Sequence, residues 1–506
     1  MMMRSLIGQG GGAGMRAKAR VGAAAAVVLI ACSLAGATVI RETELDLDVD
    51  PNGGTMAIKA RLHVAENSGE PNFVCYFLKP ARMEYLRETS SGGDVPYAFE
   101  QVPPVECGVY TCTMNLAGLP QECTLELAYS HTKDSLYAYY LNPSTTDNLV
   151  YGQITRDSVY SSHLYYYPSL EVGTGTGRVS ITVPQGWTGV TSGILKSQEP
   201  LDGDRRRFTY EIPFASGVLP YPLAVYPYVV EEAVYRDRVP VSIYCSADDV
   251  EYAKEKMERM TTKVLPFLEE ILGDYPWPAL RIVEVFPREG NTGLAAKGMV
   301  MLSKAVWFSA AIGDSYTTPP ATVLVDEMAH QWNAYRVQLP NYLAEGVSEY
   351  TDNLSMERFA GRDTYAANMA AYRQSYAELV ILLDYLKSCH DKGQTVEQAA
   401  ATLGLPASAF SPLWPYAPFG ELPISDPRIF PSLYFIKGAL ALDALRAEIG
   451  DEPFFKGFKA VFAGPADQLL TLDYFRGCFE TVHGGSLAAF FHRWYEEPGL
   501  PDVTRR

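Results

Sequence analysis

Four residues between positions 326 and 345 have the types and spacing of a metal site. Asp326 and His330 are four residues apart in the stretch ATVLVDEMAHQWNAY, so on an α-helix they lie on the same face. Glu327 is turned by about 100° from Asp326 and would address the open position of a bound metal. Glu345, in the next predicted helix, can supply a third ligand. Taken alone, an acidic residue followed four positions later by histidine is more typical of a surface ion pair.

Several separate segments favour a metal site over a surface ion pair. DEMAHQW is similar to the pattern HExxHQW, and YLAEGVSEY is similar to WLNEGFAxY. SLYFIKGALALDALRAEIGDEPFFKGFKAVF and the closing LTLDYFRGCFETVHGGSLAAFFHRWYEEPGLP match further segments of the same family. Together these motifs make most of residues 45–502 resemble the membrane alanyl aminopeptidase family of zinc metallopeptidases, the gluzincins that include leukotriene hydrolase.

The resemblance implies an α+β fold, with an N-terminal antiparallel β saddle followed by a mostly helical, thermolysin-like domain. It also implies zinc held by Asp326, His330 and Glu345. Such a metal would lower the pKa of a bound water, and Glu327 would accept its proton as the water attacks a peptide carbonyl.

Four departures from the family pattern affect this chemistry. Asp326 replaces the first histidine with a shorter, negatively charged ligand, which would weaken or abolish zinc binding or favour a harder ion. Phe435 stands where the family carries a tyrosine that stabilises the tetrahedral intermediate, and the neighbouring Tyr434 is expected to pack elsewhere. Ala295 stands where a glutamate binds the substrate's amino terminus. The connection from His330 to Glu345 is also about one helical turn shorter than usual in the family.

Two functions follow from these departures. The favoured one is a catalytically weak or inactive relative that binds a peptide or a protein in the former substrate cleft. The alternative is an active, atypical zinc-dependent peptidase with Glu327 as general base. A plainer interpretation stays open, in which Asp326 and His330 make a hydrogen bond on a helix surface and the protein is an interaction module. The other six histidines show no ligand spacing and are interpreted as ordinary surface or core residues.

Residues 1–40 predict export. MRAKAR (15–20) is cationic, and the twenty residues that follow it are apolar or small. The segment allows cleavage after Ala37, lipid attachment at Cys32, or an uncleaved single span. All three outcomes place residues 41–506 outside the cytoplasm, and the two anchored ones attach the protein to a membrane. Beyond residue 40 the chain has 38 basic and 59 acidic residues, which argues against nucleic acid as a partner.

The rest of the chain divides into two predicted domains. Residues 41–235 contain short alternating runs such as MAIKARLHV and RFTYEI between NGG, SGG and PQG turns, which predict a β domain. Residues 236–506 are helix-rich, with strands at 281–286 and 298–303, a helix opened by Pro319 and Pro320, and a proline-rich loop at 406–431.

Seven cysteines follow Cys32, an odd number for a compartment in which disulfides form. Cys107, Cys112 and Cys123 are the best candidates for a local bridge. Buried free thiols are an equally good interpretation of most of them.

Overall fold

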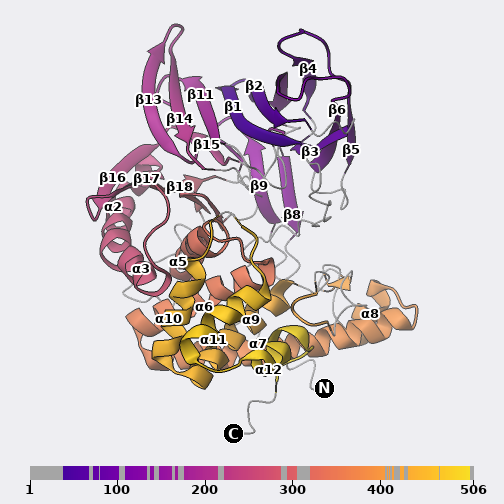
Figure 1. Cartoon of the computed structure of the whole chain (residues 1–506), viewed down its shortest axis with the longest axis vertical. Helices are drawn as coiled ribbons and strands as arrows, with labels where there is room; N and C mark the ends of the chain where they lie inside the picture. Colours follow the sequence, from indigo (N-terminus) through magenta and orange to yellow (C-terminus); the bar gives the residue numbers. More distant parts are fainter. Residues whose placement is uncertain are drawn as a thin grey trace.

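A computed structural model describes most of the chain, as two domains drawn in Figure 1. The described residues are 38–67, 72–78, 80–101, 109–133, 137–141, 148–161, 166–168, 176–214, 221–286, 293–304, 319–404, 407, 410, 413–414, 422–426, 431–466 and 468–501. The predicted export segment therefore lies almost wholly outside them, as does most of the proline-rich loop.

The β domain is built on a seven-stranded sheet with the order β13-β14-β11-β1-β2-β7-β4. Alternation explains its central strand, because Leu45, Leu47 and Val49 are buried while Asp46 and Asp48 between them are exposed. The strands are β1 (Val39–Asp50), β2 (Thr55–Glu66), β4 (Arg82–Glu88), β7 (Cys123–Thr132), β11 (Thr176–Pro184), β13 (Ile194–Leu201) and β14 (Arg205–Ile212). Their pairing is antiparallel except between β1 and β11, which run parallel.

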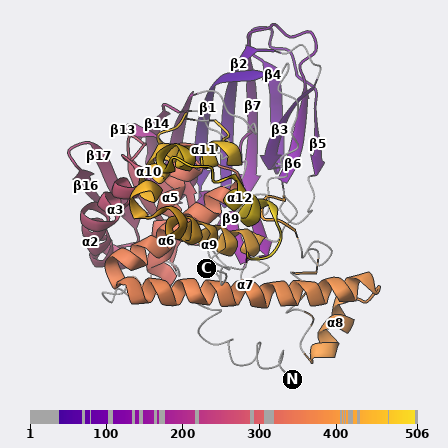
Figure 2. The ribbon, with the colours of Figure 1, turned by 60° about the horizontal axis from the view of Figure 1, so that its bottom comes forward.

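Two smaller sheets complete this domain. A five-stranded sheet has the order β12-β15-β10-β9-β8, and a three-stranded sheet has the order β3-β6-β5. Their strands are β3 (Asn72–Leu78), β5 (Tyr97–Gln101), β6 (Val109–Asn115), β8 (Tyr137–Leu141), β9 (Asn148–Ile154), β10 (Val159–Ser161), β12 (Thr188–Val190) and β15 (Leu223–Tyr226). Figure 2 shows the three-stranded sheet beside β7 and β4.

The second domain opens with a mixed sheet of order β16-β17-β18-β20-β19. Its strands are β16 (Val229–Tyr235), β17 (Val239–Cys245), β18 (Leu280–Val285), β19 (Gly293–Ala296) and β20 (Met299–Ser303). The crossover between the parallel strands β17 and β18 contains α2 (Val250–Arg259), the π-helical segment η3 (Met260–Val264) and α3 (Leu265–Leu272). The predicted boundary after residue 235 falls between the paired strands β16 and β17.

Helices form the rest of the second domain. They are α5 (Pro319–Asn333), α6 (Asn341–Ala360), α7 (Arg362–Asp391), α8 (Val396–Leu403), α9 (Pro431–Ile449), α10 (Asp451–Phe462), α11 (Leu472–His483), α12 (Ala488–Phe491) and the π-helical segment η6 (His492–Glu496). Figure 2 shows α7 as one long rod beneath the others. No helix among the described residues is both long and apolar enough to cross a membrane.

A close approach of α6 and α9 fixes the centre of the helical domain. A Cβ added to Gly346 would lie 2.8 Å from the Cα of Gly438, and one added to Gly438 would lie 2.7 Å from the Cα of Gly346. Only glycine at both positions lets the two backbones come this near. The domains themselves meet at a buried contact in which Arg281 Nη1 donates to the carbonyl oxygen of Gly193 over 2.6 Å. The predicted α+β class, with a β-rich domain followed by a helical one, is confirmed.

Candidate metal and catalytic site

Two adjacent helices position the predicted site residues. Asp326, Glu327 and His330 lie in the second half of α5, which begins at two prolines, as is common in a first helical turn. Glu345 lies in the first turns of α6, where every residue from 343 to 356 is buried. All four residues are at most 9% exposed. The sequence prediction of a surface ion pair therefore does not describe this group.

His330 stands between the two candidate carboxylate ligands. Its Nε2 atom is 3.8 Å from Asp326 Oδ2 and 3.6 Å from Glu345 Oε2. The shortened connection between α5 and α6 therefore still brings Glu345 to the imidazole. Asp326 Oδ1 is buried and has no hydrogen-bond partner among the described residues.

Asn333 and Ser348 hold the other side of the imidazole. His330 Nδ1 is 3.1 Å from Asn333 Oδ1 and 3.2 Å from Ser348 Oγ. Asn333 Nδ2 donates to the carbonyl oxygen of Ala344 over 2.9 Å and to Ser348 Oγ over 2.8 Å, which joins α5 to α6. Because the Asn333 carbonyl oxygen accepts from Nδ1, the Nε2 lone pair faces the carboxylates, an orientation typical of metal-binding histidines.

The three candidate ligands nevertheless do not fit a zinc ion as they stand. Ligands of a tetrahedral zinc lie roughly 3.4 Å from one another, because each bond is near 2.1 Å. Asp326, His330 and Glu345 do not bring one ligand atom each within 4.8 Å of both others, as a search of the described residues shows. In the described arrangement these three side chains are therefore not gathered closely enough to share one zinc ion.

Burial and repulsion between neighbouring carboxylates shift the pKa values of the site residues. Burial, and then the nearby Glu349 and Glu327 carboxylates, raise the pKa of Asp326 well above its usual range. Burial and the same kind of repulsion raise the pKa of Glu345. Burial lowers the pKa of His330 to about 4 against the opposing hydrogen bond to Asn333. Without a cation, burial therefore favours the neutral form of each of these three side chains.

Strand β19 lies against Glu327. A Cβ added to Gly293 would be 3.2 Å from Glu327 Oε1. Burial raises the pKa of Glu327 to about 8, although a hydrogen bond with the backbone of Ala295 lowers it in part. The carbonyl oxygen of Ala295 accepts from Tyr335 Oη over 2.6 Å. Ala295, predicted from the sequence to face the substrate's amino terminus, is thus next to the candidate general base and offers only its backbone.

Phe435 and Tyr434 lie in the buried core of the helical domain. They are 3% and 8% exposed, and their ring centroids are 4.8 Å apart in an edge-to-face arrangement. Phe435 lies one turn of α9 before Gly438, which contacts α6 beside Glu345. A phenyl ring at this position cannot donate a hydrogen bond.

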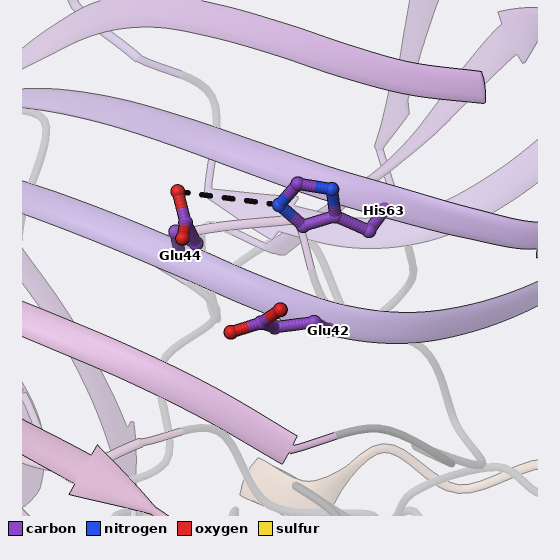
Figure 3. A group of neighbouring side chains, drawn as sticks. All are labelled: Glu42, Glu44 and His63. Carbon is purple, nitrogen blue, oxygen red and sulfur yellow. Dashed lines mark ion pairs between the residues drawn. The ribbon is translucent and has the colours of Figure 1, made fainter.

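A second carboxylate and histidine group lies on the β domain. Glu42, Glu44 and His63 bring one ligand atom each within 4.8 Å of one another, and Figure 3 shows them on neighbouring strands. Glu44 is already paired with Arg61 and Arg178. His63 lies directly opposite Glu42 in the β1–β2 ladder. The group is therefore explained by cross-strand charge pairing, in line with the sequence interpretation of His63 as an ordinary surface or core residue.

Sequence reasoning missed four residues that shape the site. Asn333 and Ser348 orient the imidazole, and Glu349 and Asp352 add buried carboxylates whose charges raise the pKa of Asp326. A signal was present, because Glu349 and Asp352 follow Glu345 by four and seven residues and so lie on the same face of α6.

Comparison with known proteins agrees with this fold. Aminopeptidase N of Streptomyces lividans is 24% identical over 486 residues, which are 91% of this chain and 50% of that protein. Aminopeptidase N of Caulobacter vibrioides is 27% identical over 161 residues, 31% of this chain and 18% of that protein. The chain thus spans about half the length of the first curated relative. No family model matches it.

Solved structures show the same architecture. The M1 zinc metallopeptidase from Deinococcus radiodurans superimposes with a TM-score of 0.63 at 18% identity, covering 92% of this chain and 95% of that one. The native yeast LTA4 hydrolase superimposes with a TM-score of 0.64 at 15% identity, covering 92% of this chain and 69% of that one. The chain is a relative of the M1 metallopeptidases. The family resemblance drawn from the motifs is confirmed, and zinc is the usual cofactor that it implies.

Proposed function

We propose that this M1 relative is catalytically weak or inactive and that it binds a peptide or a protein at the face formed by α5, α6 and β19. The observation that carries the proposal is the separation of Asp326 from Glu345, which leaves no three-ligand zinc centre among the predicted residues. Phe435 adds a second deficit, since loss of one donor to a tetrahedral intermediate costs roughly a hundred- to a thousandfold in rate.

Zinc binding tests this proposal directly. The purified chain, dialysed against zinc, is expected to retain much less than one equivalent by elemental analysis. Asp326→His is expected to restore one equivalent, because an imidazole Nε2 reaches one bond further from the backbone than a carboxylate oxygen. Asp326→Asn is the matched control, with the same reach and no charge. Stoichiometric zinc in the wild type, with hydrolysis of free amino-terminal substrates, would overturn the proposal.

A combined variant tests the catalytic part. Asp326→His with Phe435→Tyr restores the first ligand and the hydroxyl donor together. We expect hydrolysis of a peptide substrate to appear in this variant. It should not appear in Asp326→His with Phe435→Trp, because the indole N–H of tryptophan does not lie where the tyrosine hydroxyl would. No gain over the wild type would mean that the ligands and the donor are not what limits the site.

The second candidate is an active, atypical zinc-dependent peptidase with Glu327 as general base. It is favoured by the orientation of His330 Nε2 and by the unpartnered Asp326 Oδ1, because both atoms are buried and available to a cation. Zinc-dependent cleavage of blocked peptides, lost in Glu327→Gln, would establish it. Absence of such cleavage at any zinc concentration would exclude it.

We also propose that the protein is exported and anchored in the cell envelope through residues 1–40. The support is the cationic stretch followed by twenty apolar or small residues. Metabolic labelling with palmitate distinguishes the anchors, because lipid attachment requires Cys32 and is lost in Cys32→Ser. Recovery of the whole protein in the cytosol would refute export.

A further inference from the structure

Cys75 and Cys112 lie directly opposite each other in neighbouring antiparallel strands. The ladder between β3 and β6 pairs Cys75 with Cys112, between the pairs Val74–Thr113 and Tyr76–Thr111. Opposed residues in such a ladder have Cα atoms about 4.5 or 5.5 Å apart, depending on their position in it. Both separations fall within the range of about 4.4–6.8 Å that a disulfide spans.

The two side chains also share one face of the small sheet. Cys75 and Cys112 are 2% and 0% exposed, whereas Val74 beside Cys75 is 50% exposed and points the other way. Cys75 Sγ lies 3.6 Å from the carbonyl oxygen of Cys112. The hydrogen bond between the thiols, with burial, raises the pKa of Cys75 well above its usual range. Two thiols thus face each other in the core of the β domain.

Other cysteines in the described part of the domain are placed differently. Cys123 begins β7 in the seven-stranded sheet, where it pairs with Val64 of β2. Cys112 lies in the separate three-stranded sheet. Cys107, the third member of the group predicted from the sequence, lies outside the described residues. The ladder therefore favours Cys75, which the sequence did not single out, as the partner of Cys112.

We propose that Cys75 and Cys112 form a disulfide when the chain folds in the presence of a disulfide-class oxidant. One thiol loses its proton and attacks the oxidant, displacing one thiolate and leaving a mixed disulfide. The second thiol then attacks the protein sulfur of that mixed disulfide and displaces the other thiolate. Two cysteine thiols are oxidised and one oxidant disulfide is reduced to two thiols.

The bond would close a loop that passes through two sheets. Between Cys75 and Cys112 the chain forms β4, at the edge of the seven-stranded sheet, and β5, in the three-stranded sheet. A cross-link here restricts the unfolded chain and fastens the edge strand β3 to the central strand β6. Because both sulfurs are buried, the bond must form before the sheet closes and is then protected from exchange.

In the cell, the proposal rests on export, because cytosolic thiols are kept reduced. In vitro the oxidant is supplied and export plays no part. Failure to form the disulfide in vitro would therefore refute the disulfide and would leave the proposal of export untouched. The full chain is unfolded, refolded with oxidised glutathione, alkylated and digested with trypsin and chymotrypsin. Chymotrypsin separates the relevant cysteines, because Tyr110 lies between Cys107 and Cys112, and Leu116 lies between Cys112 and Cys123.

The expected product is one linked pair of peptides containing Cys75 and Cys112, lighter by two hydrogen atoms than the sum of the free peptides. Linkage of Cys112 to Cys107 or Cys123 would overturn the proposal. Recovery of Cys75 and Cys112 as alkylated thiols after oxidative refolding would also overturn it.

Stability provides the second measurement. We expect the Tm of the oxidised protein to fall by roughly 5–10 °C on reduction. Cys75→Ser and Cys112→Ser should each remove this dependence on reductant. Cys123→Ser, a half-buried cysteine of the same domain, is the matched control and should keep it. If reductant still lowers the Tm of Cys75→Ser, the disulfide does not join Cys75 to Cys112. If a variant fails to fold, the peptide map of the wild type tests the proposal instead.

Discussion

The contact between Gly346 and Gly438 allows a sharp prediction about the helical domain. In Gly346→Ala the new Cβ would lie 2.8 Å from the Cα of Gly438 and 3.1 Å from its carbonyl carbon, whereas ordinary contacts begin at 3.4 Å. The obstacle is backbone, so it cannot rotate away, and α6 must move from α9 by about half an ångström or more. Overpacking of this kind costs about 1–3 kcal/mol.

Helix propensity acts in the opposite direction. Replacing glycine by alanine within a helix gains about 1 kcal/mol. We therefore expect Gly346→Ala to lower the free energy of unfolding by up to about 2 kcal/mol. Gly477→Ala is the matched control, because Gly477 lies inside α11 and an added Cβ there meets nothing within 4 Å. That substitution is expected to raise the free energy of unfolding by up to about 1 kcal/mol.

Urea unfolding followed by far-UV circular dichroism measures both changes. The two substitutions are chemically identical, so the difference between them isolates the steric cost. Gly438→Ala should resemble Gly346→Ala, and the double variant should cost less than the sum, because one separation of α6 from α9 relieves both clashes. If Gly346→Ala proves as stable as Gly477→Ala, the helices do not approach as closely as described, and the placement of Glu345 relative to α9 loses its support.

Two further predictions concern stability. Burial opposes ionisation of Glu126, but hydrogen bonds from Arg87, Tyr85 and Arg61 outweigh it and lower its pKa to about 2. Because the pKa of Glu126 is lower in the folded state, its ionisation stabilises the fold by at most about 3 kcal/mol. This stabilisation is present above pH 4.5 and is lost as the pH falls to 2. Urea unfolding across this pH range should show the loss of stability in the wild type and not in Glu126→Gln. Thr471 caps α11 by accepting a hydrogen bond from Tyr474 N over 3.1 Å, so Thr471→Ala should cost about 1 kcal/mol and Thr471→Ser much less.

Each of these two predictions has an outcome that would contradict it. A wild type and a Glu126→Gln variant with parallel pH profiles would mean that the three donors do not hold this carboxylate in solution. Equal losses in Thr471→Ala and Thr471→Ser would mean that the methyl group of the threonine, and not its oxygen, stabilises the start of α11.

The sequence predicted those elements whose periodicity or end signals are strong. Pro319 and Pro320 marked the start of α5, and the alternating run MAIKARLHV lies within β2. The parallel pairing of β1 with β11 could not be predicted, because no local pattern specifies a partner some 130 residues away. Helix α7 was not predicted, although its buried residues Tyr365, Met369, Tyr372 and Tyr376 recur at helical spacing.

In the site, too, the features set within one helix could be predicted from the sequence, and those set by helix packing could not. The order of residues in α5 gave the common face of Asp326 and His330 correctly. The distance between the Asp326 and Glu345 carboxylates depends on how α5 packs on α6, which the sequence does not state. The same is true of Asn333, whose role appears only when its amide is seen to reach Ala344 across the helix pair.

The position of β1 has a consequence for synthesis on the ribosome. The first strand stands in the middle of the seven-stranded sheet, with β2, β7 and β4 on one side and β11, β14 and β13 on the other. One side can assemble as soon as residue 132 has emerged, but the other edge of β1 stays open until residues 176–184 follow. During that interval the nascent chain exposes the unpaired backbone edge of β1, with which another copy of the chain can pair. A chaperone that covers this edge at that stage of synthesis would therefore favour correct folding.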